Sequence, residues 1–566
     1  MKLKTTLLGA VAMMAMAPAA FAERGSDGEV KLTFPQAVSI MNSYLSAGTK
    51  DVIAASMVIE PLAGFDDKGN LIPRLVTEIP TVANGGISAD MTSITWKLIP
   101  GLLWSDGTPV TADDVVFTAN YCLDPAGGCA GLSKFDGIKS VEALDAATVK
   151  VTFTAPKPNP YTAFVGNQAP VIQKAQFAAC IGAAAPTCTD QNNMPIGTGP
   201  FMVTGFTVND TVSMAANPNY RDAAKPAFAT ATIKGGGDAE GSARAVMETG
   251  EFDYAWNTQI PPDSQAAMTT AGKGQFVVAF GTSVERIEIN LTDPSADLAE
   301  GERSTVKHPH PILSDIKVRQ ALSMAIDRQI LSEVGYGAGG SPTCNILPAP
   351  PAFVSDNTGC LTQDIEGAKK LLDEAGWMVG ADGIREKDGK KLHLLYQTTV
   401  NPIRQDFQAL VKDWWTEIGV DTELKATDPG VFFGGDAGSP DTYQKFYADV
   451  EMFTNNFDGT DPEAFLSGSL CSKIPSPDSQ WQGDNINRYC DAAYDAKWAE
   501  LSAASDPAKR QEIAKVLNDM MTKDSFTEIP LVHRGTLSAH SNTLGGVVIN
   551  AWDTELWNVQ DWFRVK

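Results

Sequence analysis

The chain has 566 residues and a formal net charge of −24 at pH 7, with 44 Lys and Arg against 68 Asp and Glu. Binding to nucleic-acid phosphates needs a positive surface, so this acidic balance argues against a nucleic-acid-binding role. The length exceeds that of an ordinary single domain, so we expect at least two lobes. No short repeat, low-complexity block or long flexible linker occurs in the sequence, which favours lobes connected by chain crossings.

The first 22 residues have the pattern of a secretory signal peptide. Lys2 and Lys4 form a basic start, residues 7–17 are apolar, and residues 20–22 form a small-x-small cleavage site. The apolar run is shorter than the roughly 20 residues that a membrane-spanning helix needs. We therefore expect cleavage after Ala22 and an exported, periplasmic mature chain.

Eight cysteines occur as close neighbours along the chain. An even number of cysteines in an exported chain favours disulfides, each contributing about 2–3 kcal/mol by restricting the unfolded chain. There is no C-x-x-C motif and the five histidines are scattered, so we expect neither a metal site nor another cofactor. The simplest pairing is Cys122–Cys129, Cys180–Cys188, Cys344–Cys360 and Cys471–Cys490.

Residues 94–117, ITWKLIPGLLWSDGTPVTADDVVF, predict a strand, a turn and the start of a helix. Apolar side chains alternate over residues 94–98, as in a half-buried strand. Asp106-Gly107 is typical of a turn, and Thr111 with Asp114 three residues later predicts a helix N-terminus.

Three later segments also predict local structure. Thr148–Phe153 alternates at period two and predicts a strand. Pro195–Val203, PIGTGPFMV, has glycines for a tight turn but lacks the Lys-Ser/Thr of a phosphate-binding loop. Leu313–Arg328, LSDIKVRQALSMAIDR, predicts one helix with a buried apolar stripe, in which Asp327 and Arg328 are structural partners at the end.

In this order and spacing, the segments resemble those of the peptide-type (family 5) extracytoplasmic solute-binding proteins of ABC importers. The resemblance implies an α/β, two-lobe periplasmic-binding-protein-like fold of type II, with an extra subdomain in lobe I. We expect chain crossings near Thr282–Leu291 and Phe526–Arg534. The expected parts are residues 1–22, signal peptide; 23–75, first part of lobe I; 76–195, extra subdomain; 196–285, second part of lobe I; 286–527, lobe II; and 528–566, the return to lobe I.

The resemblance also implies a function. Such a protein captures a solute between its lobes and delivers it to the permease subunits of an importer, which work with cytoplasmic ATPases. We expect a monomer that is not an enzyme and that binds a short peptide or an amino-acid-derived solute. Binding of an oligosaccharide or an opine by the same scaffold is the alternative.

Met452–Leu466, MFTNNFDGTDPEAFL, resembles the cleft loop of the family. The resemblance puts Asp458 where an acid pairs with the α-ammonium group of a peptide, by charge-assisted hydrogen bonds. The alternative is an ordinary Asp-Gly turn. Phe457 precedes this acid, and the amides of Asn455 and Asn456 would suit a ligand with hydroxyl groups.

Further candidates come from segments with matching surroundings. The resemblance puts Gly48 and Thr49 in a lobe I loop beside the ligand, and Trp256 and Asn257 at positions that face the cleft. Trp256 is equally compatible with a place in the core. Arg286, at the first crossing, would bind a carboxylate through two hydrogen bonds, or would be an exposed arginine at the hinge.

A cell-envelope hydrolase is the main alternative of another class. Neither G-x-S-x-G nor H-E-x-x-H occurs. His308 and His310 stand between prolines, which predicts an exposed loop and not a metal site. A chaperone or adhesion module would show exposed apolar strands or repeats, and the sequence predicts neither.

Overall fold

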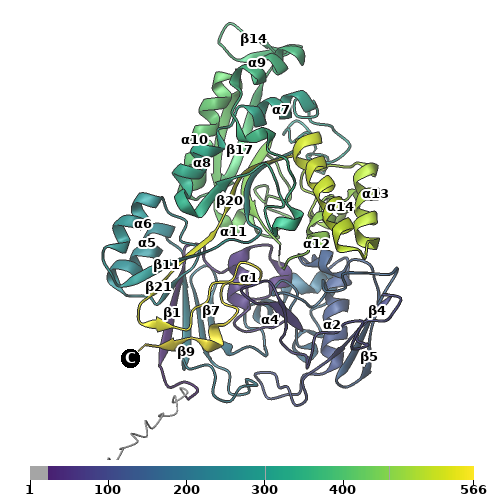
Figure 1. Ribbon diagram of the computed structural model, residues 1–566, viewed down its shortest axis with the longest axis vertical. Coiled ribbons are helices and arrows are strands. Elements are labelled where there is room, and N and C mark those ends of the chain that lie inside the picture. The colour runs from purple at the N-terminus through teal and green to yellow at the C-terminus, as the bar shows by residue number, and fades with distance from the viewer. Residues whose placement is uncertain (1–22, 300, 458, 566) are drawn as a thin grey trace, which may run out of the picture.

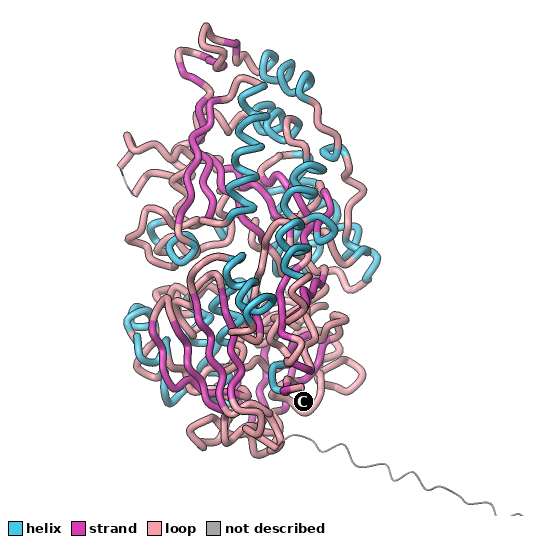
Figure 2. The backbone as a smooth tube through the Cα atoms, turned by 90° about the vertical axis from the view of Figure 1, so that its left-hand side faces the viewer, coloured by secondary structure: helices cyan, strands magenta, loops and turns pink. Residues whose placement is uncertain are grey.

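The computed structural model describes residues 23–299, 301–457 and 459–565. Two lobes lie one above the other along the long axis of the molecule (Figures 1 and 2). Each lobe is built around its own β-sheet, so the predicted two-lobe α/β fold is confirmed.

Lobe I contains a seven-stranded sheet with β1 near its centre. Strand β1 runs parallel to both of its neighbours, β9 and β10. Its apolar side chains Val30, Leu32 and Phe34 are fully buried in the core. In spatial order the strands are β11 (Gly274–Ala279), β21 (Thr536–Ser541), β10 (Tyr254–Ala255), β1 (Glu29–Phe34), β9 (Thr230–Gly235), β8 (Thr211–Ala216) and β7 (Phe201–Thr207). The helices of this lobe are α1 (Thr49–Ala55), α5 (Ala239–Arg244) and α6 (Pro262–Thr269).

An extra subdomain extends lobe I. Its strands β4 (Ser93–Lys97), β6 (Thr148–Phe153) and β5 (Ile138–Asp145) form an antiparallel sheet beside helix α2 (Ala112–Leu123). Thr111 and Asp114 form the predicted capping box at the start of α2, and β6 has the predicted alternating burial. The core of this subdomain begins before residue 76, because it includes Tyr44, Leu62 and Leu75. Smaller elements here are β2 (Ala63–Phe65), β3 (Leu71–Pro73), α3 (Lys174–Phe177) and α4 (Thr189–Asn193).

Lobe II contains a six-stranded sheet with two different faces. In spatial order the strands are β13 (Gly340–Pro342), β20 (Glu528–Arg534), β12 (Val284–Ile289), β19 (Val450–Asn455), β17 (His393–Thr399) and β18 (Asp421–Thr427). One face packs into a large apolar core with the helices α7 (Ile316–Met324), α8 (Arg328–Gly335), α9 (Ile365–Glu374) and α10 (Pro402–Glu417). Aromatic residues around α11 (Pro429–Phe432) cover part of the other face.

The rest of lobe II forms separate units. A second apolar core joins α12 (Glu463–Ser467), α13 (Ala492–Ala503) and α14 (Pro507–Asp519). The strands β14 (Met378–Val379), β15 (Arg385–Lys387) and β16 (Lys390–Lys391) make a small sheet at the tip of the lobe (Figure 1). In lobe I, near the C-terminus, β22 (Leu544–Gly545) pairs with β23 (Phe563–Arg564).

The chain changes sheet twice, at adjacent places. It leaves the lobe I sheet after β11 and enters the lobe II sheet at β12. It returns between β20 and β21, later than the predicted boundary at residue 528, because Glu528–Arg534 pairs with β12 in the lobe II sheet. The two crossings are close, since the Arg534 N–H donates to Ser283 O over 3.1 Å.

The prediction of one helix over Leu313–Arg328 was wrong. Two helices, α7 and α8, form instead, because the Asp327 side chain accepts from the Ile330 N–H and so caps the start of α8. Arg328 is fully buried and donates to backbone carbonyls, among them Pro530 O at 2.7 Å. Its structural role comes from these carbonyls and not from an ion pair with Asp327.

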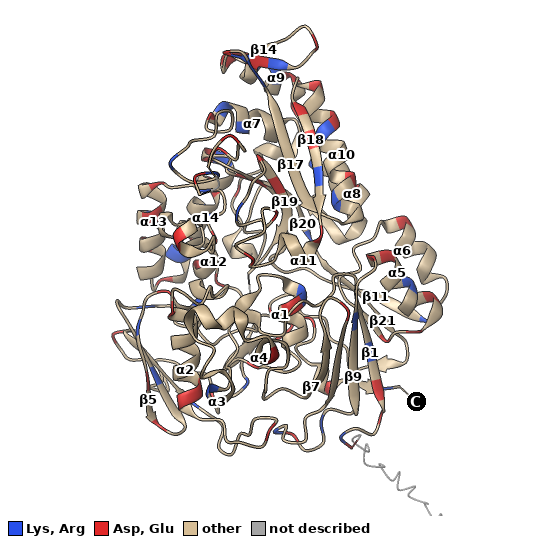
Figure 3. Cartoon of the chain, turned by 180° about the vertical axis from the view of Figure 1, so that it is seen from behind, with Lys and Arg blue, Asp and Glu red and all other residues tan. Residues whose placement is uncertain are grey.

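The four predicted disulfides are confirmed, with Cα–Cα separations of 4.6–5.9 Å. In the described part of the chain, no helix has both the length and the apolar character needed to cross a membrane. Acidic and basic residues are spread over both lobes (Figure 3).

Candidate functional site

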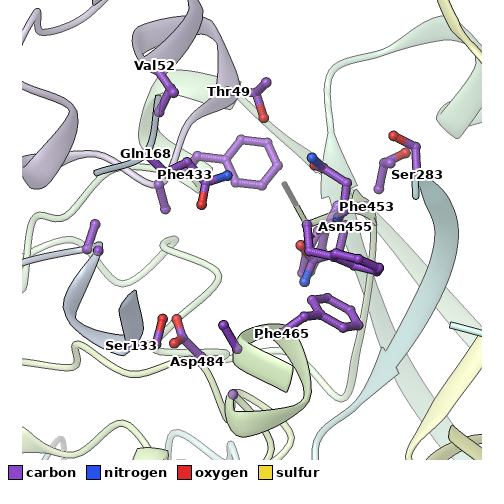
Figure 4. Close-up of a pocket in the computed structure, with 18 of the residues that line it drawn as sticks. Thr49, Val52, Ser133, Gln168, Ser283, Phe433, Phe453, Asn455, Phe465 and Asp484 are labelled. Carbon is purple, nitrogen blue, oxygen red and sulfur yellow. Dashed lines mark hydrogen bonds between the residues drawn. The ribbon is translucent and has the colours of Figure 1, made fainter. Parts of the chain in front are cut away.

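A cavity of about 300 Å³ lies between the lobes. Lobe I contributes Thr49 and Val52 of α1, together with Gln168, and lobe II contributes Phe433, Phe453, Asn455 and Phe465 (Figure 4). Ser283 lines the cavity from the first crossing. A volume of this size is at the lower end of the range for small-molecule sites.

A buried ion pair lies at the start of α1, in the lobe I wall of the cavity. Lys50 Nζ lies 2.6 Å from Asp51 Oδ2, and the same carboxylate accepts from Ser46 Oγ at 2.6 Å. Gly48 is buried above this pair, where a Cβ would meet both Asp51 and Ser46 at 3.3 Å. Of the two predicted loop residues, Thr49 lines the cavity, whereas Gly48 is not among the described residues that line it.

Trp256 and Asn257 both line the cavity, on the side of lobe I. Trp256 is only 3 % exposed and packs against Phe34, with ring centroids 4.9 Å apart, so it belongs to the core and the cavity wall together. Asn257 has a φ of 53°, a conformation that Asn tolerates better than most residues. Its backbone N–H donates to Ser538 Oγ over 3.0 Å, which ties it to β21.

Asn455, Asn456 and Phe457 line the cavity from the end of β19. The Asn456 N–H donates to Asn455 Oδ1 over 2.9 Å. The backbone of Phe457 is held by the Thr282 hydroxyl, which accepts from its N–H at 2.9 Å and donates to its carbonyl at 2.7 Å. Asp458 lies outside the described residues, so its predicted role stays a prediction.

Arg286 lines the cavity but is not the exposed arginine that the sequence allowed. It is 5 % exposed and has two carboxylates of its own chain. Its Nε donates to Glu288 Oε1 over 2.5 Å, and its Nη1 lies 2.9 Å from Glu528 Oε2. These two carboxylates already pair with the Arg286 guanidinium, which we expected to bind a carboxylate of the ligand.

Sequence reasoning missed a second group of buried charges. Arg404 and Arg534 line the cavity and share one acid, Glu285. Arg404 Nε donates to Glu285 Oε1 over 2.7 Å, while Arg534 Nε donates to Thr454 Oγ1 over 2.8 Å and lies 3.8 Å from Glu285. All three charged residues are at most 8 % exposed.

The pKa values in this group are shifted by burial and by the neighbouring charges. Burial acts to raise the pKa of Glu285, but Arg404 and Arg534 lower it overall. Burial lowers the pKa of the Arg534 guanidinium, although Glu285 opposes this. Glu285 is the carboxylate in contact with both guanidinium groups, and Glu555, a buried acid that also lines the cavity, is the next acid near Arg534. An anion in the cavity would add a second direct partner.

Sequence reasoning also missed the aromatic wall formed by Phe433, Tyr443, Phe453 and Phe465.

The buried charges did leave a signal in the sequence. Three of the six residues of β12, VERIEI, are charged, and all six are buried. Charged residues are rarely buried unless they are paired or functional, so such a strand marks a site.

The two lobes also contact each other at the rim of the cavity. Lys473 Nζ of lobe II lies 2.6 Å from Asp136 Oδ1 of the extra subdomain. Nearby, Ser133 hydrogen-bonds to Asp484 across the same gap (Figure 4). These contacts join the two lobes at this edge of the cavity.

The predicted exposed loop at His308 and His310 was half correct. His310 is 1 % exposed and its Nε2 lies 2.8 Å from Asp449 Oδ1, whereas His308 is partly exposed beside Glu302. Across the described ranges, no group of three or more His, Cys, Asp or Glu side chains is placed to hold a metal ion.

Known proteins resemble this chain in sequence and in fold. Protein XP55 of Streptomyces lividans is 29% identical over 353 residues, which are 62% of this chain and 58% of that protein. The glutathione-binding protein GsiB of Escherichia coli is 24% identical over 542 residues, covering 95% of this chain and 94% of GsiB. The oligopeptide-binding protein AppA of Bacillus subtilis, solved with a nonapeptide, has a TM-score of 0.81 at 20% identity, covering 96% of this chain and 100% of AppA.

The model of the bacterial extracellular solute-binding proteins, family 5, matches residues 70–475. That match includes most of the extra subdomain, the first crossing and the greater part of lobe II. A cavity at the boundary between two lobes is a common place for a ligand site. The chain therefore belongs to the family 5 extracellular solute-binding proteins.

Proposed function

We propose that this protein is the periplasmic, ligand-capturing subunit of an ABC importer and that it holds a short peptide or an amino-acid-derived solute between its lobes. The observation that carries the proposal is the cavity itself, which both lobes line and which has buried charges of both signs. The names of GsiB and AppA, a glutathione-binding and an oligopeptide-binding protein, support a peptide-like solute.

The size of the cavity favours a small solute. A volume of about 300 Å³ is at the lower end of the range for small-molecule sites. This space suits a compound of a few amino-acid residues.

Two opposite charges of a peptide have candidate partners in the site. The guanidinium charge of Arg404 and Arg534 suits a ligand carboxylate. Asp458 is proposed to hold the α-ammonium group, and the residues on either side of it, Phe457 and Asp461, line the cavity. The proposed protein binds its solute unchanged and needs no nucleophile or general base.

The proposal is tested in two steps. Mass spectrometry of compounds released from the denatured, purified protein identifies what it carries, and calorimetry then measures the affinity for di- and tripeptides. We expect micromolar or tighter binding of a peptide that stays intact. Tight binding of a sugar or an opine instead would favour the non-peptide alternative, and cleavage of the peptide would favour the hydrolase.

A further inference from the structure

Three glutamates lie side by side across the sheet of lobe II. In the strand register, Glu288 of β12 is directly opposite Glu451 of β19 and Glu528 of β20. Side chains directly opposite each other in an antiparallel sheet share one face. Ile287 and Ile289, on either side of Glu288 in β12, face the apolar core. The three carboxyls therefore lie on the opposite face of the sheet, toward the aromatic wall and the cavity.

One guanidinium, that of Arg286, contacts this row of three carboxyls, and burial raises the pKa of Glu528 and Glu451. All three glutamates are at most 3 % exposed, and like charges directly opposite each other destabilise a sheet. Arg286 contacts Glu288 and Glu528, while Gln397 donates a neutral hydrogen bond to Glu451 at 3.1 Å. The other nearby guanidinium, that of Arg488, donates to four backbone carbonyls.

Part of the row opens onto the cavity. Glu288, Glu528 and Arg286 all line it. Although Glu528 Oε2 and Arg286 Nη1 are 2.9 Å apart, neither atom has a hydrogen bond of acceptable geometry. The contact is therefore an ion pair without a hydrogen bond, which leaves part of the cost of burying the Glu528 carboxylate uncompensated.

Aromatic rings surround the same end of the cavity. Phe453 is the cross-strand neighbour of Arg286, and Phe433, Tyr443 and Phe465 complete the wall. Ring faces attract cations, and the Arg286 guanidinium already lies 5.5 Å from the Phe465 ring centroid. Loss of solvent, together with the carboxyls of Asp484, Glu451 and Glu288, raises the pKa of the Tyr443 hydroxyl, so that ring lies in the field of the acids.

We infer that this end of the cavity binds a basic side chain of the ligand, an alkylammonium or guanidinium group, between Glu528, Glu288 and the aromatic wall. The inference rests on the proposed function and narrows it to short peptides, or amino-acid derivatives, with a basic side chain. The ligand cation adds positive charge beside the Glu288 and Glu528 carboxyls that line the cavity, while the rings contact its flat or methylene portion.

The first test uses matched ligands. Calorimetry at pH 8 compares Ala-Arg with Ala-citrulline, and Arg-Ala with citrulline-Ala, because citrulline has nearly the shape of arginine without its charge. In at least one pair we expect the arginine peptide to bind about tenfold tighter or more, a ratio worth about 1.4 kcal/mol. Equal affinities in both pairs would overturn the inference.

A variant locates the effect. Glu528→Gln keeps the shape of the side chain and removes its charge, so the ratio within the responsive pair falls to about one. Glu366→Gln is the control, since it makes the same change on the exposed surface of α9 and leaves the ratio unchanged. A Glu528→Gln protein that keeps the full preference for arginine would contradict the site.

Failure of this inference is distinguishable from failure of the proposed function. Peptide binding without a preference for arginine overturns the basic-side-chain site and leaves the peptide-binding function standing. If none of the four dipeptides and no other short peptide binds, the proposed function fails, and the inference fails with it.

Discussion

Two charged clusters lie on neighbouring residues of β12 and differ in their balance. Glu285 has two arginines, Arg404 and Arg534, whereas Arg286 has two glutamates in contact and a third in the same row. Both clusters are buried and both reach the cavity. Both clusters contain ion pairs, so they differ in the ratio of opposite charges and not in the presence of pairs. We propose that the first cluster binds an anionic group of the ligand and the second a cationic group.

We expect the largest effect from replacing Glu285, the carboxylate that pairs with both Arg404 and Arg534. Glu285→Ala leaves two buried guanidinium groups without their carboxylate, so we expect the free energy of unfolding to fall by about 3–5 kcal/mol. Urea denaturation of the ligand-free protein measures this. Glu366→Ala, an exposed change on α9, is the control and should stay within about 0.5 kcal/mol. A loss as small as that of the control would mean that Glu285 does not balance the arginines.

The Asp458→Ala variant tests whether the α-ammonium group of the ligand binds to an acid outside both clusters. Asp458→Ala should weaken the binding of a peptide with a free amino terminus by about 2–5 kcal/mol, the range for removing one partner of a buried charge pair. The N-acetylated form of the same peptide should bind wild type and variant alike. Wild-type affinity of the variant for the free peptide would assign the ammonium group to another acid.

The pH dependence of stability tests the acidic cluster. Burial raises the pKa of Glu528 to about 8, and Glu288 adds to the rise while Arg286 opposes it. Other titratable groups near this cluster are Glu451, Tyr443 and Tyr494, and Arg488 and Lys425 act on Glu451. Because the folded-state pKa exceeds that of an exposed glutamate, about 4.3, the protonated carboxyl stabilises the fold at low pH, and this contribution is lost as pH rises through about 8.

We therefore expect ligand-free wild type to lose stability from pH 5 to pH 9 relative to Glu528→Gln, by up to about 4 kcal/mol, since about three pH units separate pH 5 from the folded-state pKa. Thermal unfolding of both proteins across this range measures the difference. Parallel curves for the two proteins would show that Glu528 does not titrate there.

The smallest effect is expected at the rim, outside both clusters. Lys473→Ala removes the ion pair with Asp136 between the lobes, in which both side chains are partly exposed. Such pairs contribute about 0.5–1 kcal/mol, so we expect ligand affinity to fall two- to fivefold. Calorimetry measures this against Lys369→Ala, which breaks a surface ion pair within α9. An unchanged affinity would show that the contact does not favour the closed arrangement.

Local signals predicted much of the scaffold. The Thr111–Asp114 capping box, the alternation in Thr148–Phe153 and all four disulfides appear as expected. These features depend on residues close together in sequence, so their physical causes are visible there. The break at Asp327 was also visible as a capping residue, but the buried stripe on both sides of it suggested one continuous helix.

The candidate site was predicted in part. Thr49, Trp256, Asn257, Arg286 and residues 455–457 line the cavity, as the family resemblance led us to expect. Arg404, Arg534, Glu288 and Glu528 were missed, because neither the strand nor the helix that carries each one shows which other charges lie opposite it.

The sequence alone determined the family, the two-lobe architecture and the disulfide pairs, since motif order and local spacing encode them. Only the tertiary structure decided the charge at each end of the cavity. That charge depends on strand register, which places Glu288 opposite Glu451 and Glu528, and on α10, which brings Arg404 to Glu285. Electrostatic energy depends on distance in space, and these partners are far apart along the chain.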